Sequence, residues 1–234
     1  MIKKVKHKNM CKGRSRPSPT LCISKIKCVY LVILLLLFTF ACAEHPDTTL
    51  AKLKEQSVNI DSASKTFDID PVKLKAIIYV ERTNNYNWQD EYFDDYLAKK
   101  GQNSSIGFCQ VKMKTAYWIE CQLSDSTSVF YPGKKYENVL QVSQLPQKII
   151  DKLEDNRTNL LYASAYMRII QSYWESRGYS IDERVDIIAT IFSYGIFSRA
   201  TGEALKPNAN PQPNWFGGEA LKTYFILSNN NLKR

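Results

Sequence analysis

Glu81 is the residue best placed to do chemistry in this sequence, because it ends the apolar stripe of a predicted helix. Asp70 at the N-cap position and Pro71 at the first helical position predict a helix over 70–82. Its apolar residues recur at the i, i+3, i+4, i+7 spacing of one face, and they are Leu74, Ile77 and Ile78. A carboxyl group on that face is expected to lose hydration, which raises its pKa. Cleavage of a glycosidic bond needs such a proton-holding acid near neutral pH.

The same position has a plainer interpretation. A Glu in the last turn of an amphipathic helix commonly packs its methylene groups against the helix surface, while its carboxylate reaches solvent or pairs with a cation such as Arg82. The helix pattern alone favours this interpretation. A catalytic role for Glu81 therefore depends on residues elsewhere in the chain.

Histidine is nearly absent from the sequence, and its two positions are His7 and His45. The chain after His45 consequently offers no Ser-His-Asp or Cys-His triad, no HExxH motif and no zinc site built on imidazole. It also lacks a GxGxxG or phosphate-binding loop. An enzyme built from this chain would have to work with carboxylates, amides and hydroxyls.

The formal net charge of +9 belongs to the N-terminal segment. Residues 1–43 contain nine of the 32 Lys and Arg residues and none of the 23 Asp and Glu residues, so the rest of the chain is neutral. This distribution argues against a nucleic-acid partner, which would require a basic folded surface.

Residues 1–43 have the layout of a secretory signal or a membrane or lipoprotein anchor. A basic stretch precedes an apolar run over 29–41, which is shorter than the roughly 20 residues of a membrane span. Cleavage after Ala43 and lipidation of Cys42 both fit the small residues that follow, and Met10 is an alternative start. The sequence predicts export to the periplasm or cell envelope, with membrane attachment through this segment or Cys42.

The chain after the leader is expected to form a tether over 44–60, with a short first helix as the alternative, and one all-α domain over 61–234. Residues 121–145 are expected to be irregular. Further helices are predicted over 110–120, 146–154, 156–177, 181–199 and about 218–228.

Two cysteines, Cys109 and Cys121, fall within the predicted domain. An oxidising compartment permits a disulfide between them. Two small buried thiols are the equal alternative.

Three segments carry a shared pattern. The first is the helix end 76–81, the second is the Gly-x-x-Gln run followed by Thr-Ala over 107–116, and the third is 159–167. In this order and internal spacing, which hold across roughly residues 60–200, they resemble the lytic transglycosylase family, whose fold is lysozyme-like. The resemblance implies an all-α domain with a catalytic cleft in which Glu81 is the catalytic acid.

The resemblance also implies a set of substrate-binding residues. Gln110 would exchange hydrogen bonds with the sugar, and Gly107 would let the backbone approach the ligand. Their spacing of three is expected to place both on one face of a helix opening. Asn159 and Tyr166 would be partly structural and partly cleft-lining.

One stretch departs from the family pattern. The family carries a late Tyr-Asn-x-Gly run whose Tyr contacts the catalytic Glu, whereas this chain has Phe192-Ser193-Tyr194-Gly195. Tyr194 would have to supply the hydroxyl after a register shift, and on a helix it is expected to point about 200° away from Phe192. Tyr194 completes the predicted binding set, and the departure keeps open a non-catalytic glycan-binding module of the cell envelope.

The implied substrate is the peptidoglycan glycan strand, and the implied chemistry needs no metal or cofactor. Glu81 would protonate the oxygen of the β-1,4 bond between N-acetylmuramic acid and N-acetylglucosamine, and would later accept the C6 hydroxyl proton to leave a 1,6-anhydro end. A lysozyme-type hydrolase is the alternative, and it needs a second carboxylate. Candidates for that carboxylate are Asp90, Glu91, Asp94 and Asp95, and candidate cleft aromatics are Trp88, Tyr117, Trp118 and Trp215.

Overall fold

The computed structural model describes residues 43–85 and 103–231, which belong to one compact unit and are mostly helical. The prediction of a mainly helical fold is confirmed. The predicted leader, with Cys42 and Met10, and the acidic segment with Trp88 lie outside the described residues. Within the described ranges no helix has the length and apolarity needed to cross a membrane.

The helix starts at Pro71 and Asn156 are each capped by the preceding aspartate. Asp70 accepts a hydrogen bond from the backbone N–H of Val72 at 2.7 Å, and Asp155 accepts one from that of Thr158 at 2.8 Å. The elements in chain order are α2 (Pro46–Glu55), α3 (Ser57–Thr66), α4 (Pro71–Val80), the π-helical turn η1 (Glu81–Asn85), β1 (Ser105–Ile106), β2 (Val111–Lys112), α6 (Met113–Ser124), the 3₁₀ turn η2 (Lys134–Tyr136), α7 (Pro146–Glu154), α8 (Asn156–Glu175), α9 (Val185–Tyr194) and α10 (Trp215–Asn231).

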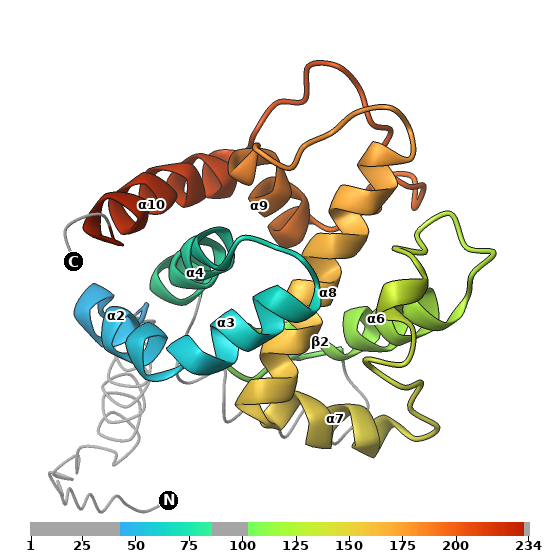
Figure 1. Cartoon of the computed structure of the whole chain (residues 1–234), viewed down its shortest axis with the longest axis horizontal. Coiled ribbons are helices and arrows are strands. Elements are labelled where there is room, and N and C mark those ends of the chain that lie inside the picture. The colour runs from blue at the N-terminus through green and yellow to red at the C-terminus, as the bar shows by residue number, and fades with distance from the viewer. Residues whose placement is uncertain (1–42, 86–102, 232–234) are drawn as a thin grey trace, which may run out of the picture. The chain divides into compact units, whose positions relative to one another are not determined.

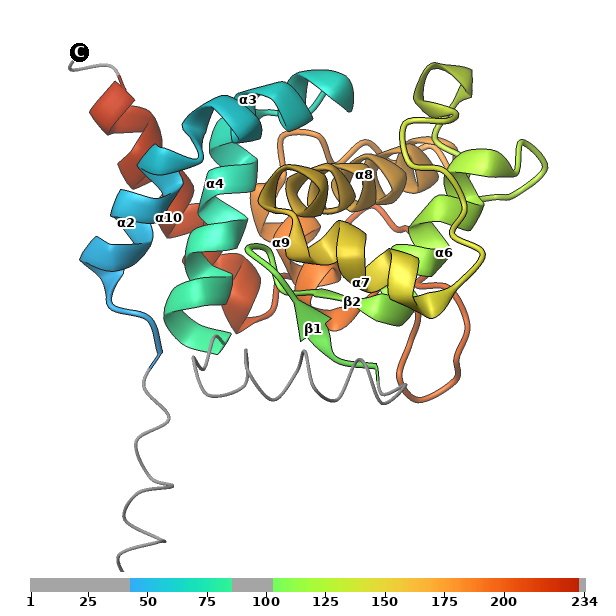
Figure 2. The ribbon, with the colours of Figure 1, turned by 90° about the horizontal axis from the view of Figure 1, so that it is seen from below.

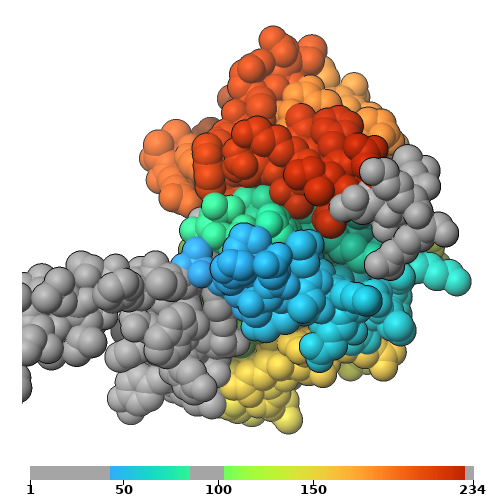
Figure 3. Space-filling model, turned by 90° about the vertical axis from the view of Figure 1, so that its left-hand side faces the viewer, coloured from blue at the N-terminus to red at the C-terminus, as the bar shows by residue number. Residues whose placement is uncertain are grey.

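The longest helix among the described residues, α8, lies at the centre of the core (Figure 1). It packs against α3, α6, α7 and α9, and its fully buried side chains include Leu160, Tyr162 and Met167. On the other side of the core, α10 packs along both α4 and α9. The helix that leads to Glu81 is therefore held between α10 and the N-terminal helices, as Figure 3 shows for α4 (green) between α10 (red) and α2 (blue) with α3 (cyan).

Residues 44–60 do not form the predicted tether. They contain α2 and the start of α3, and they bury Thr49, Leu53 and Ile60 against the core. The helical alternative to the tether is what the structure has, and Leu53 and Ile60 dock this stretch on the core. The folded unit thus begins immediately after the predicted leader.

Residues 105–112 form a small antiparallel hairpin beside α7 (Figure 2). Its pairs are Ser105 with Lys112 and Ile106 with Val111, so Gly107–Gln110 is the connecting loop. The expectation that Gly107 and Gln110 open a helix is wrong. Both have positive φ angles, 75° and 53°, which a right-handed helix does not allow, and α6 begins only at Met113.

Candidate active site

A cavity of about 470 Å³ brings together four of the six predicted site residues. Its walls come from η1, the hairpin with the start of α6, α8 and the end of α9. Among the described lining residues Glu81 is the single carboxylate. The predicted site residues found here are Glu81, Gln110, Tyr166 and Tyr194.

Glu81 follows directly after α4 and is partly buried. The stripe that precedes it is buried as predicted, with Leu74, Ile77 and Ile78 at most 1 % exposed. The backbone N–H of Glu81 still donates to the carbonyls of Ile77 and Ile78. Glu81 then opens the π-helical turn, so its side chain stands at the wall of the cavity where the apolar face ends.

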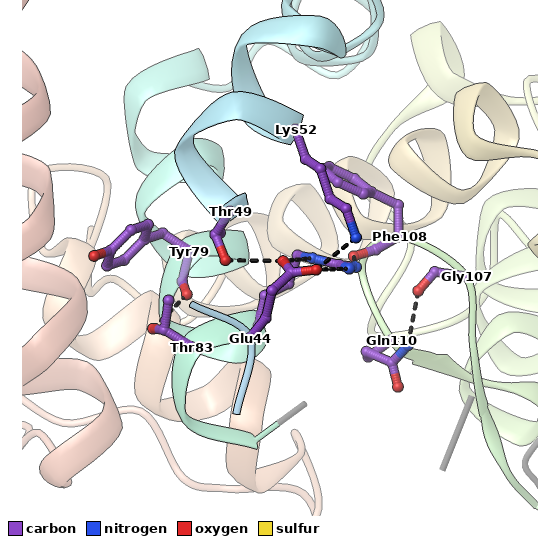
Figure 4. A network of polar contacts seen from close by, with 9 residues as sticks. Glu44, Thr49, Lys52, Tyr79, Thr83, Gly107, Phe108 and Gln110 are labelled. Carbon is purple, nitrogen blue, oxygen red and sulfur yellow. Dashed lines mark hydrogen bonds and ion pairs between the residues drawn. The ribbon is translucent and has the colours of Figure 1, made fainter. Parts of the chain in front are cut away.

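Arg82 connects this turn to two distant segments, at Glu44 and Phe108, both of which are labelled in Figure 4. Its guanidinium is 2 % exposed and donates from Nε and Nη2 to the Glu44 carboxylate at 2.7 and 2.8 Å. Its Nη1 donates to the Phe108 carbonyl in the hairpin loop at 3.0 Å. Arg82, the cation that the plainer interpretation places near Glu81, thus binds Glu44 and the Phe108 carbonyl.

The carboxylate of Glu44 is only 7 % exposed. Burial alone would raise its pKa, but hydrogen bonds from Arg82, Lys52 and Thr49 outweigh burial and lower the pKa from 4.5 to about 2. The Lys52 ammonium and the Thr49 hydroxyl donate at 2.5 and 2.8 Å. Glu44 stays charged at neutral pH and balances the buried Arg82. Sequence analysis missed this residue because it lies 38 positions before its partner.

Gln110 sits in the cavity wall with its side chain fixed. Its Nε2 donates to the Gly107 carbonyl at 2.8 Å, across the hairpin loop (Figure 4). Its Oε1 accepts no hydrogen bond from the described residues, and in Figure 4 this oxygen points away from Gly107. A hydroxyl or amide N–H of a sugar could donate to it.

Gly107 and Asn159 lie behind the cavity and do not line it. Asn159 is fully buried, donates to the carbonyls of Ile106 and Leu153 at 2.9 Å, and accepts from the Cys109 N–H at 2.7 Å. A Cβ atom on Gly107 would stand 2.1 Å from the Leu153 carbonyl oxygen. Gly107 thus permits the close approach of Leu153 and Asn159. The sequence predicted that Gly107 lets a ligand approach the backbone, whereas in the structure it lets these two residues pack against it.

Tyr166 lines the cavity from α8 and is 6 % exposed. Its hydroxyl accepts a hydrogen bond from the Ile196 N–H at 3.0 Å, and burial raises its pKa well above the usual range. Its ring lies 5.5 Å from that of Phe192 between centroids. Tyr166 therefore has both of the roles left open by the sequence: it supports the core and lines the cavity.

The end of α9 contributes Phe192, Ser193, Tyr194 and Gly195 to the cavity together. Phe192 and Tyr194 both belong to the last turn of α9, which stops at Tyr194, and Gly195 continues with φ of 105°. Both nevertheless line the cavity. Tyr194 is 38 % exposed, and the guanidinium of Arg199 lies 4.9 Å from its ring centroid. Tyr194 accordingly brings a hydroxyl to the cavity, while Phe192 brings none.

The predicted cleft aromatics lie in different parts of the structure. Trp118 packs within an aromatic cluster, with its centroid 5.3 Å from that of Phe130, and Tyr117 lines a separate hollow. Trp215 is 61 % exposed beside the cavity. Only Trp215 among these three remains a candidate for sugar contact.

A second buried glutamate, Glu120, has no access to the cavity. It is fully buried, accepts from the N–H and hydroxyl of Ser143 at 2.7 and 2.9 Å, and pairs with Lys152 at 2.7 Å. Its hydrogen bonds tie the 125–145 loop to α6 and α7. This carboxylate is structural, which leaves Glu81 as the catalytic candidate among the described residues.

Cys109 and Cys121 are both free thiols, with Cys109 buried. Burial raises the pKa of the Cys109 thiol well above its usual range. Of the two alternatives that the sequence allowed, a disulfide or two thiols, the structure has two thiols.

No protein-family model matches this sequence, and no curated protein matches it at a significant level. The functional argument consequently rests on the cavity and on the residues that line it.

Proposed function

We propose that this protein is a peptidoglycan lytic transglycosylase with a lysozyme-like fold and that Glu81 is its single acid and base. The observation that carries the proposal is the cavity at the end of α4. Its volume of about 470 Å³ suits a small-molecule or sugar ligand. Glu81 is the one carboxylate among its described lining residues, and Gln110, Tyr166 and Tyr194 line the same cavity from three other parts of the chain.

The chemistry follows from one carboxyl group. Glu81 gives its proton to the glycosidic oxygen as the bond to C1 of N-acetylmuramic acid breaks, and the N-acetyl oxygen of that sugar attacks C1. The Glu81 carboxylate then takes the proton of the C6 hydroxyl, whose oxygen displaces the N-acetyl oxygen from C1. The products are a 1,6-anhydro end and a free C4 hydroxyl, and Glu81 regains its proton.

Two other functions have a specific basis. A lysozyme-type hydrolase needs a second carboxylate or a positioned water, and the candidates at Asp90, Glu91, Asp94 and Asp95 lie outside the described residues. A non-catalytic glycan-binding module is favoured by Phe192, which lines the cavity without a hydroxyl. The single carboxylate of the described cavity wall favours the transglycosylase.

The site is expected to work outside the cytoplasm. The leader over 1–43 would carry the domain to the periplasm or cell envelope, where its partner is the glycan strand. The protein would be released by cleavage after Ala43 or held at the membrane through the N-terminal segment or a lipid on Cys42.

The test is digestion of purified peptidoglycan followed by mass spectrometry of the released fragments. We expect 1,6-anhydro muropeptides from the wild type and a loss of at least a hundredfold in Glu81→Gln, which removes general acid and base catalysis. Glu175→Gln, an exposed change at the end of α8, is the matched control. Reducing ends would identify a hydrolase, binding without release would identify a module, and full activity of Glu81→Gln would refute the assignment.

A further inference from the structure

A second cavity of about 320 Å³ adjoins the first at the end of α9. The two share Ser193, Tyr194 and Arg199, so they lie against the same three residues. The far wall of the second cavity is Asn214, Trp215 and Phe216 at the start of α10. None of these three was placed in the catalytic mechanism above.

Trp215 is an exposed aromatic ring on a firmly held helix end. Asn214 caps α10, because its Oδ1 accepts from the Gly217 N–H at 2.9 Å, and its own N–H donates to the Thr190 hydroxyl at 3.0 Å. A Cβ atom on Gly217 would stand 2.1 Å from the Asp186 carbonyl oxygen, so α10 meets α9 in direct contact here. An indole face of 61 % exposure beside a sugar-sized cavity is a platform for stacking of a sugar ring.

Arg199 stands at the boundary between the two cavities. Its guanidinium is placed over the Tyr194 ring, and within the described ranges no carboxylate forms an ion pair with it. Lys112 adds a second cation to the first cavity, against the one carboxylate of Glu81. The joined surface is therefore complementary to a ligand that carries negative charge.

We propose that the second cavity binds a carboxylate-bearing sugar unit of the glycan strand, next to the disaccharide whose bond is cleaved at Glu81, with its ring on Trp215 and its carboxylate on Arg199. This inference rests on the proposed function, since it extends the same binding site. The carboxylate can belong to the sugar's own lactyl group or to a peptide attached to it. The Arg199 guanidinium can bind a carboxylate from either source through the same charge-assisted hydrogen bonds.

The test measures binding to the full chain carrying Glu81→Gln, so that the ligand is not consumed. Three ligands are compared: glycan strands with peptides, strands stripped by an amidase, and neutral chitooligosaccharides. We expect Arg199→Gln to weaken binding of a carboxylate-bearing ligand roughly fivefold and to leave the neutral one unchanged. Loss confined to stripped strands identifies the lactyl group, and loss confined to peptide-bearing strands identifies the peptide. Trp215→Ala should weaken all three roughly fivefold.

Matched controls exist for both changes. Arg177→Gln removes another guanidinium that lies over a tyrosine ring, 5.6 Å from the Tyr173 centroid and away from both cavities. Phe225→Ala removes another exposed ring from α10, at 57 % exposure. We expect both controls to bind like the parent protein.

The outcomes separate this inference from the proposed function. An equal effect of Arg199→Gln on charged and neutral ligands, or no effect of Arg199→Gln or Trp215→Ala, would overturn the second binding site even if the wild type cleaves peptidoglycan. A charge-dependent effect with no cleavage by the wild type would support the binding site and remove the catalytic proposal.

Discussion

Replacement of Glu44 tests the idea that the N-terminal residues hold the turn of Glu81 in place. Glu44→Gln keeps the shape of the side chain but removes the negative charge that Glu44 places against Arg82, a residue that is 2 % exposed. Breaking a buried ion pair in this way costs about 3–5 kcal/mol. The lowering of the Glu44 pKa from 4.5 to about 2 corresponds to a contribution of roughly 3 kcal/mol to the free energy of unfolding, at about 1.4 kcal/mol per pKa unit.

The dependence on pH follows from the sign of this shift. The pKa of Glu44 is lower in the folded protein than in the unfolded chain, so its contribution is complete above the unfolded value of 4.5 and disappears as the pH falls toward 2. Urea unfolding of the wild type and Glu44→Gln should therefore differ by roughly 3 kcal/mol at pH 7. The difference should shrink steadily from about pH 4.5 downward.

Asp47→Asn is the control for this experiment, because Asp47 lies on the same helix α2 with its side chain 87 % exposed. Asp47→Asn should change the free energy of unfolding by no more than about 0.5 kcal/mol. The reasoning is refuted if Glu44→Gln is as stable as the wild type at pH 7, or if their difference is the same at pH 7 and pH 3. We also expect slower glycan cleavage by Glu44→Gln below its unfolding temperature, since Arg82 fixes the turn that Glu81 opens.

Two further substitutions test the packing behind the cavity, and one labelling experiment tests the state of the cysteines. Gly107→Ala should lower the free energy of unfolding by roughly 2–3 kcal/mol, measured by urea titration, because its φ is positive and a Cβ atom would strike the Leu153 carbonyl. Asn159→Ala should cost roughly 3 kcal/mol in the same assay, because it leaves a buried N–H and buried carbonyls unpaired. Finally, Cys109 and Cys121 are free, so alkylation of the unfolded, unreduced protein should label both, and reductant should leave the melting temperature unchanged. A loss under 0.5 kcal/mol in either variant, or an unlabelled pair, would contradict the structure.

Helices with local start signals could be predicted from the sequence. The predicted helix over 146–154 coincides with α7, and α4 and α8 begin within a residue of their predicted starts. These starts depend on nearby chemistry, a proline or an aspartate that caps the first turn. Information within a few residues is sufficient for such features.

Features that depend on distant partners could not be predicted in the same way. The loop Gly107–Gln110 resembles a helix opening in its spacing, yet Asn159 and Arg82 hold it as a hairpin loop through hydrogen bonds across at least 26 positions. Glu44 has no local pattern that marks it as a partner of Arg82. Its role appears only when α2 packs against η1.

The site of Glu81 depends on the manner in which α4 ends. A catalytic acid needs partial desolvation together with access to its substrate. If the buried apolar face continued past Glu81, its carboxyl group would be desolvated but would not reach a substrate. The π-helical turn that begins at Glu81 ends the buried face there, so the side chain is partly buried and still lines the cavity. Phe192 lines the same cavity without a hydroxyl. Any side-chain hydrogen bond from the end of α9 to the Glu81 carboxyl must therefore come from Ser193 or Tyr194.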